Sequence, residues 1–247
     1  MRTLSLPSGL EVQLQEVSVK LAMDIASHSK ALQEYYITQT LNQLQPESVK
    51  IDAATWSAED RYFAMLDLYI MEHTEEAQLE QSLRYVNCHA CSKDHEIQLY
   101  YPSLIHSFKK LETPLPEIEH LGVHYQLRPL NGAVMEKIEQ LRLKMPNPEV
   151  VGESDFQAYL RSDQHAALSS ALDFIQVAGY LGQEVEAFDD MLYKDFKILE
   201  KKVGTQVSKL RHGIDFSVTV TCPDTKGSPE VTRPVPFLEL PVLTELF

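Results

Sequence analysis

The chain of 247 residues is 44% hydrophobic and has a formal net charge of −14, an acidic composition with enough apolar residues for one large or two small domains. The excess of acidic residues repels phosphate, so we expect no nucleic acid as a partner. No stretch approaches the roughly 20 apolar residues of a membrane span, and no apolar run follows Arg2 as in a signal peptide. We therefore expect synthesis in the cytosol and no membrane span.

The first part of the chain predicts a strand, helices and a hairpin. Apolar and polar residues alternate over 9–15, which indicates a half-buried strand, and near-helical spacing over 17–44 predicts a helix that ends before Pro46. Ser57 is expected to cap the next helix, with the carboxylate of Asp60 reaching back toward the cap. An aromatic and methionine stripe on that helix is interpreted as core: Tyr62, Phe63, Met65, Leu66, Tyr69 and Ile70. Strands are expected next over 83–87 and 95–101.

The same plan restarts after a linker that we expect over 109–119. A strand over 122–128 and a helix over 131–144 are followed by a long helix, which Ser154 is expected to cap and which ends near Gly179. A further helix over 183–203 is expected to be closed by Gly204. The last predicted elements are strands over 214–221 and 229–235.

Two ungapped matches relate the two parts of the chain. Residues 9–25 match 122–138, and residues 85–104 match 219–238. The change in offset puts about twenty-one additional residues in the helical middle of the second part. Since apolar faces of one copy can be covered by a second copy, we interpret the pattern as a duplication. The predicted fold class is α+β, with two pseudo-repeated units over 1–113 and 114–247. Identical residues include Gly9/Gly122, Gln13/Gln126, Leu14/Leu127, Ile25/Ile138, Cys88/Cys222 and Pro102/Pro236.

The cysteines form one complete and one incomplete knuckle motif. Cys88 and Cys91 lie two residues apart in a predicted hairpin turn, the spacing at which both thiolates can bind one zinc ion. Cys222 opens the second hairpin in the same way, but Thr225 stands where a fourth cysteine would be. A neutral threonine hydroxyl is a poor zinc ligand, so this motif lacks one of its ligands.

Two readings of the knuckles remain open. In the first, zinc is bound by the three cysteines with His95 as the fourth ligand, or with His89 or Asp224 in its place. In the second, the turns keep their shape without metal and the cysteines are reduced and half-buried. Three cysteines in a reducing compartment argue against a disulfide framework, and no thioredoxin-like context surrounds the motif.

Motifs of catalysis are missing from the sequence. There is no phosphate-binding glycine loop, no G-x-S-x-G elbow and no H-E-x-x-H helix. The nine histidines are scattered, and His120 and His124 lie in a linker that runs into a strand, so they are not expected to share a helix face. We expect that the protein is not an enzyme.

The order of short motifs resembles a known family. Leu6-Pro7-Ser8-Gly9 enters a strand, Glu59-Asp60-Arg61 leads an apolar helix, and the runs Val86 to Cys91 and Val220 to Thr225 open two hairpins. This order resembles the baseplate hub assembly proteins of contractile-tailed bacteriophages, which commonly carry two such knuckles after helical segments. The resemblance implies no catalysis. It implies a protein that acts with other tail and hub proteins in building the baseplate hub in the host cytoplasm. The resemblance leaves open whether the protein also stays in the finished virion tail.

Two other classes stay open beside this one. The first is a zinc-ribbon adaptor of a cellular transcription or ubiquitin-type complex, for which complete knuckles and a basic groove would be the evidence. The second is a hydrolase without a recognisable motif, which would need a pocket with convergent polar groups.

The last segment, from Pro234 to Phe247, is expected to be an attachment element. It is largely apolar, and Pro234, Pro236 and Pro241 argue against a long helix or a central strand. Each large apolar side chain that becomes fully buried contributes about 1.5–3 kcal/mol, so the segment should pack on its own domain or on a partner. The residues expected to bind a partner are Leu240, Val242, Leu243, Leu246 and Phe247.

Overall fold

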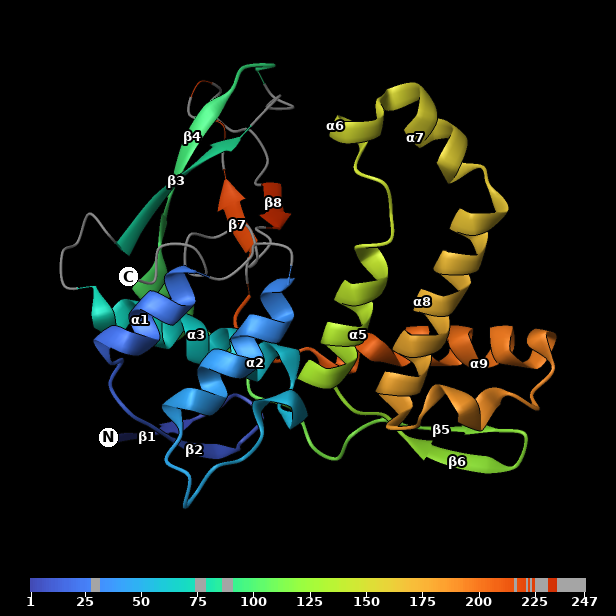
Figure 1. Ribbon diagram of the computed structural model, residues 1–247, viewed down its shortest axis with the longest axis horizontal. Helices are drawn as coiled ribbons and strands as arrows, with labels where there is room; N and C mark the ends of the chain where they lie inside the picture. The colour runs from blue at the N-terminus through green and yellow to red at the C-terminus, as the bar shows by residue number, and fades with distance from the viewer. Residues whose placement is uncertain are drawn as a thin grey trace.

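The computed structural model describes residues 1–27, 32–73, 79–85, 91–215, 217–220, 222, 224 and 231–234. Within these ranges the chain is a mixed helix and strand protein of the α+β class, with four antiparallel two-stranded sheets (Figure 1). No helix of the described residues is long and apolar enough to cross a membrane.

The first part of the chain places two hairpins around a group of helices (Figure 1). The hairpin β1–β2 precedes α1 and α2, the short 3-10 turn η2 leads into α3, and the hairpin β3–β4 ends in α4. The bounds are β1 Arg2–Ser5, β2 Glu11–Leu14, α1 Val19–Ala26, α2 Gln33–Leu44, η2 Ala53–Thr55, α3 Ala58–Glu72, β3 Glu80–Tyr85, β4 His95–Tyr100 and α4 Tyr101–His106.

The second part has the same order of elements with two more helices. The hairpin β5–β6 precedes α5, the added helices α6 and α7 lead into α8, and η4, α9 and η5 precede the hairpin β7–β8. The bounds are β5 Glu117–His120, β6 Val123–Gln126, α5 Gly132–Arg142, α6 Pro148–Val151, α7 Glu153–Leu160, α8 Asp163–Leu181, η4 Val185–Phe188, α9 Tyr193–Gln206, η5 Val207–Leu210, β7 Ser217–Val220 and β8 Val231–Pro234.

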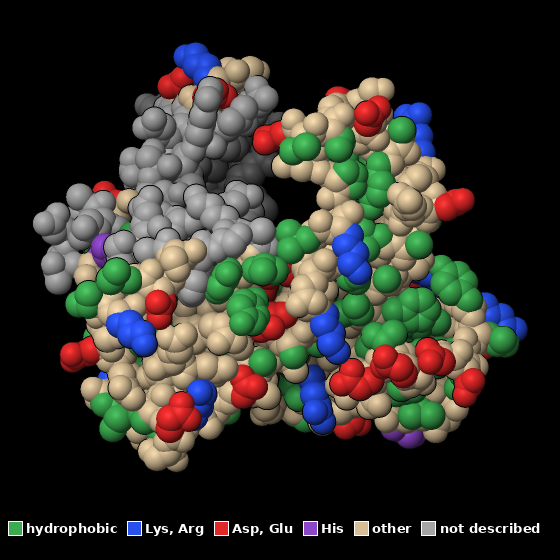
Figure 2. All heavy atoms as spheres, in the orientation of Figure 1, with side chains coloured by type: hydrophobic (Ala, Val, Ile, Leu, Met, Phe, Trp, Pro, Cys, Tyr) green, Lys and Arg blue, Asp and Glu red, His purple; other side chains and the backbone are tan. Residues whose placement is uncertain are grey.

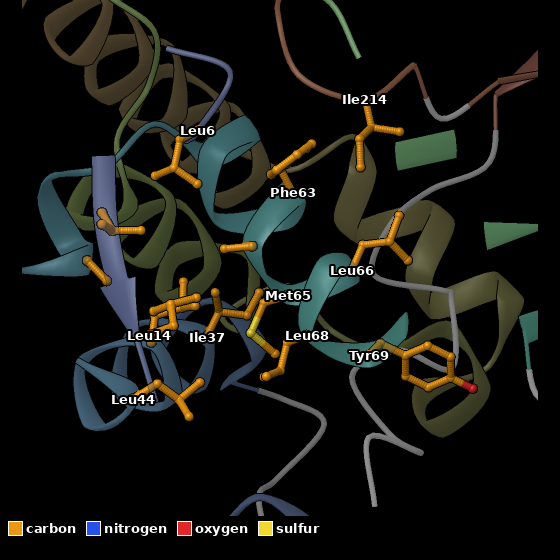
Figure 3. Packing of buried hydrophobic residues seen from close by; sticks show 14 of the residues in the cluster. Leu6, Leu14, Ile37, Leu44, Phe63, Met65, Leu66, Leu68, Tyr69 and Ile214 are labelled. Atoms are coloured by element: carbon orange, nitrogen blue, oxygen red, sulfur yellow. The ribbon is translucent and has the colours of Figure 1, made fainter. Parts of the chain in front are cut away.

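The described part of the chain has two separate apolar cores. The first, which we call the first core, packs β2, α2 and α3 together, with Leu41 and Leu66 fully buried (Figure 3). Ile214, from just before β7, also packs into this core. The second core packs the β5–β6 hairpin against α8 and α9 around Phe196 and Leu199. Apart from Ile214, each core is built from residues of one part of the chain, and side-chain hydrogen bonds such as those of Glu139 and His212 also join the two parts.

Several helix expectations are confirmed. Ser57 caps α3, since its hydroxyl accepts the amide N–H of Asp60 at 3.1 Å. The stripe on α3 is core as expected, with Met65 and Leu66 at most 2% exposed. The helix expected over 131–144 is α5.

Other helix boundaries were wrong. The carboxylate of Asp60 does not return to its own cap but accepts the N–H of Ser8 at 2.9 Å, which fixes the β1–β2 loop on α3. The segment 17–44 holds two helices, α1 and α2. The long helix expected from Ser154 is broken, because Ser162 caps α8 anew, and α8 ends at Gly182 instead of Gly179.

Both glycines that were expected to end helices lie inside them. Gly179 lies within α8, where a Cβ would come to 2.8 Å from Val134 of α5. The lack of a side chain therefore permits close packing of α8 on α5. Gly204 is in α9, which continues to Gln206. The expected linker also contains β5, which pairs with β6 through a turn at Leu121 and Gly122.

Candidate functional site

An ion pair joins the turns of the hairpins β3–β4 and β7–β8. Lys93, from the β3–β4 turn, forms an ion pair with Asp224, from the β7–β8 turn, with Nζ 2.9 Å from Oδ2. The hydrogen bond to Asp224 raises the pKa of Lys93, and Cys91 and Cys222 add smaller electrostatic contributions in the same direction. Both cysteines are half-buried. The two turns therefore bring one cysteine of each knuckle motif into the surroundings of a single lysine.

The predicted metal ligands are only partly described. Cys91 and Cys222 are placed as above, whereas Cys88 and the side chain of His95 lie outside the described residues. Across the described ranges, no group of three histidine, cysteine or acidic residues could hold a metal ion. The expected partner-binding residues Leu240, Val242, Leu243, Leu246 and Phe247 also lie outside the described residues.

A buried ion pair sits where α2, α3 and α5 meet. The side chain of Arg61, on α3, has no exposed surface, and its Nη1 lies 3.0 Å from Oε2 of Glu34, on α2. Arg61 also donates to the carbonyl of Glu34 and to the hydroxyl of Thr38. Burial raises the pKa of Glu34, while the Arg61 guanidinium and the Tyr62 hydroxyl act in the opposite direction. The guanidinium is thus the charged centre of this contact.

Helix α5 contributes two further carboxylates to this contact. Glu139 accepts the amide N–H of Glu34 at 3.1 Å, so a residue of α5 caps the first turn of α2. Helix α2 has no side-chain cap of its own at Leu32. Glu136 accepts the hydroxyl of Thr38. We call Glu34, Arg61, Glu136 and Glu139 the acidic junction.

A serine and a histidine meet at a second contact between the two parts. Nδ1 of His212 lies 2.8 Å from the carbonyl oxygen of Leu210, and Nε2 lies 2.9 Å from Oγ of Ser57. Because a carbonyl only accepts, Nδ1 carries a proton, and in the neutral ring Nε2 then accepts the Ser57 hydroxyl. Glu59 Oε2 is 3.9 Å from Nε2. Burial raises the pKa of Glu59, and His212 opposes this.

This serine and histidine have the hydrogen bond of a nucleophile and its base, but their surroundings suit a structural contact. The Ser57 hydroxyl already caps α3, and its backbone takes part in a bridge to Asn131. Both ring nitrogens of His212 have partners and its side chain is fully buried. The pair therefore ties the segment before β7 to the start of α3.

A cleft of about 530 Å³ lies between α8 and α9 and contains neither of these residues. The residues that line it include the apolar Val177 and Val203 and the aromatic Tyr180. Lys197 is paired with Asp173 at 3.2 Å and Glu200 at 2.7 Å. With Lys201, the lining contains two lysines and two carboxylates, so its formal charges balance.

The helices α6 and α7 form an arm that rises away from the rest of the second part (Figure 1). Neither helix has a buried residue. Val150 is 80% exposed, and apolar side chains are visible along the arm in Figure 2. The arm adds no side chain to either core.

Comparison with known proteins found no matching family model, no matching curated protein and no matching solved structure.

Partial signals for these contacts are present in the sequence. Lys93 and Asp224 have opposite charges in the two knuckle turns, a pattern that could have suggested their pairing. The partners Ser57 and His212 are 155 residues apart, and Glu34 and Glu139 are 105 apart. No local spacing rule reaches across such separations.

Proposed function

We propose that the protein acts by binding other proteins and has no catalytic role. The observation that carries this proposal is the arm, whose helices α6 and α7 have no buried residue and expose Val150. Ordering a helix costs conformational entropy, and the arm receives no compensation from either core of its own chain. Contact with a partner surface would supply that compensation.

The more specific proposal is a role in assembling the baseplate hub of a contractile-tailed bacteriophage. Its support is the order of motifs in the sequence, together with the adjacency of the two knuckle turns through Lys93 and Asp224. The partners would be other tail or hub proteins, and the place of action the host cytoplasm, with a place in the virion tail left open. The apolar segment 240–247 is proposed as a second attachment element.

We further propose that the two parts arose by duplication, as the sequence matches indicate. The N-caps support this: Ser18 accepts the N–H of Leu21 at the start of α1, and Asn131 accepts the N–H of Val134 at the start of α5. In the ungapped match of 9–25 on 122–138, Ser18 aligns with Asn131 and Leu21 aligns with Val134. A helix therefore begins at the same position of both copies, with a different capping residue.

Backbone contacts after the matched strands give independent support for the duplication. The amide of Gln15 donates to Leu44 at the end of α2, and the amide of Arg128 donates to Tyr180 near the end of α8. Further matched positions share their environment: Gly9 and Gly122 have positive φ, and Leu14 and Leu127, like Ile25 and Ile138, are buried.

The role of the arm can be tested with one substitution on it and one matched control. Val150, on the arm, and Val19, on α1, are both 80% exposed. We expect Val150→Asp to reduce co-purification of hub proteins from infected cells and Val19→Asp to leave it at the wild-type level. Both proteins should keep their circular dichroism spectra, because neither side chain is buried. Equal recovery of hub proteins with both variants would refute the role of the arm.

The C-terminal segment can be tested by deleting residues 240–247. We expect a folded protein that no longer joins its hub complex. A truncated chain that still assembles, or one that unfolds, would refute its proposed role as an attachment element.

A further inference from the structure

The contact of α5 with α2 and α3 contains the acidic junction, which carries more negative than positive charge. Its three carboxylates have different partners. Glu34 pairs with the guanidinium of Arg61, Glu136 accepts the hydroxyl of Thr38, and Glu139 accepts the amide N–H of Glu34. Of these, Glu34 is buried and the two α5 residues are half-buried. At neutral pH the junction therefore holds carboxylates in excess of its cation.

We propose that this junction is a proton-sensitive contact, in which uptake of a proton by the carboxylates tightens the packing of α5 on α2 and α3. The proposal concerns a conformational property of the fold and is independent of the proposed function. It is carried by the geometry of the junction, because like charges that are brought together in a partly desolvated contact repel each other more strongly than they do in water.

Glu139 and Glu34 are coupled to each other and to groups of three helices. Glu34 of α2 acts on Glu139, and Glu34 is in turn affected by Arg61 and Tyr62 of α3 and by Glu136 and Arg142 of α5. Burial raises the pKa of Glu139, Glu34 adds to the increase, and the backbone N–H groups at the start of α2 oppose it. The pKa of Glu34 is raised by its own burial despite Arg61.

The direction of the pH effect follows from proton binding. A carboxyl group whose pKa is higher in the folded than in the unfolded state binds more protons when folded, so stability rises as the pH falls through that pKa. The window lies between neutral pH and the ordinary carboxyl value. At lower pH, groups with lowered pKa values such as Asp52 and Glu112 lose their favourable contacts. Acidification is therefore expected to tighten the junction before it unfolds the protein.

Trp56 is a suitable reporter of this contact. It is the one tryptophan of the chain, it is 2% exposed, and its carbonyl accepts the N–H of Gly132 at the start of α5. Quenching of its fluorescence by acrylamide measures how often the junction opens. In the wild type the quenching constant should fall as the pH is lowered from neutral toward the ordinary carboxyl value, because carboxyl groups of raised pKa take up protons in this range.

The decisive variant is Glu139→Gln, which resembles the protonated side chain at every pH. We expect this variant at neutral pH to show the quenching constant that the wild type reaches only at the lower pH, and to lose most of its pH dependence. Glu47→Gln is the matched control, because the Glu47 side chain is 86% exposed and should leave the wild-type profile unchanged.

Three outcomes would overturn the proposal. Stronger quenching in Glu139→Gln at neutral pH would mean that the helix cap requires the ionised carboxylate. A profile equal to that of Glu47→Gln would mean that Glu139 has no part in the pH response. A wild-type quenching constant that is constant or rises on acidification would exclude a junction tightened by protons.

Discussion

At the scale of single residues, Gly132 is needed because the Arg61 side chain fills the space beside it. A Cβ at this position would lie 2.6 Å from Arg61 Nη1 and 3.0 Å from the carbonyl oxygen of Ala53. Arg61 cannot easily withdraw, because its fully buried guanidinium is bonded to α2. The glycine thus allows α5 to start directly over the buried cation.

Substituting Gly132 by alanine should therefore destabilise the protein. Overpacking of a filled site costs roughly 1–3 kcal/mol, which a urea midpoint resolves. Gly204→Ala is the control. Gly204 lies on the exposed side of α9, and a Cβ there would have no other atom within 4 Å. That change should stabilise by about 0.5–1 kcal/mol, because alanine has the higher helix propensity. Stabilisation by both substitutions would show that Arg61 can move aside.

At the scale of elements, helix starts with a local cap could be predicted from sequence. Ser57 and Asn131 stand directly before α3 and α5, and the apolar spacing of each helix begins there. The start of α2 could not be found in this way, because its cap is Glu139 on another helix. One long helix was expected from Ser154, since nothing in the sequence distinguishes Ser162 from Ser154 as a cap.

Short strands and through-space contacts explain most of the remaining differences. The strand β1 has four residues and β5 lies within an expected linker, so neither offers the long alternation that predicts a strand. Of the candidate site, the sequence supplied Cys91 and Cys222, but it could not supply the neighbourhood of Lys93 and Asp224. The pairing of these two turns depends on how the whole chain folds.

The caps of α1 and α5 should contribute similarly to stability. Ser18→Ala and Asn131→Ala each remove the side-chain acceptor of a first-turn N–H, a loss of about 1 kcal/mol. Asn147→Ala removes the same bond from α6, which has four residues and no buried side chain, so global stability should hardly change. Chemical unfolding of the three variants checks this order. A large loss for Asn147→Ala would mean that the arm contributes to the fold.

At the scale of the whole molecule, two apolar cores with polar contacts between them imply two units of stability. Leu66 is fully buried in the first core and Leu199 in the second. No residue belongs to both clusters among the described parts of the chain. Units joined in this way can unfold at different denaturant concentrations, which a single-core protein of this length would not do.

Substitution in the second core should separate the two unfolding transitions. Leu199→Ala should cost about 2–5 kcal/mol in that core, while Trp56 remains buried in the first. Helical circular dichroism should then be lost before the Trp56 emission shifts. In Leu66→Ala, where the first core is weakened, the emission should shift at or before the loss of helix. Coincident transitions in both variants would show that the contacts between the two parts couple the cores completely.

The cap that Glu139 provides to α2 has a consequence for synthesis on the ribosome. The residues of the first core leave the ribosome early, but α2 remains uncapped until Glu139 has emerged, and the core lacks one apolar side chain until Ile214 follows. The part of the chain that is made first is therefore completed last. Nascent chains arrested before residue 139 should retain a first core that is more open to proteolysis than the same residues in the full-length chain.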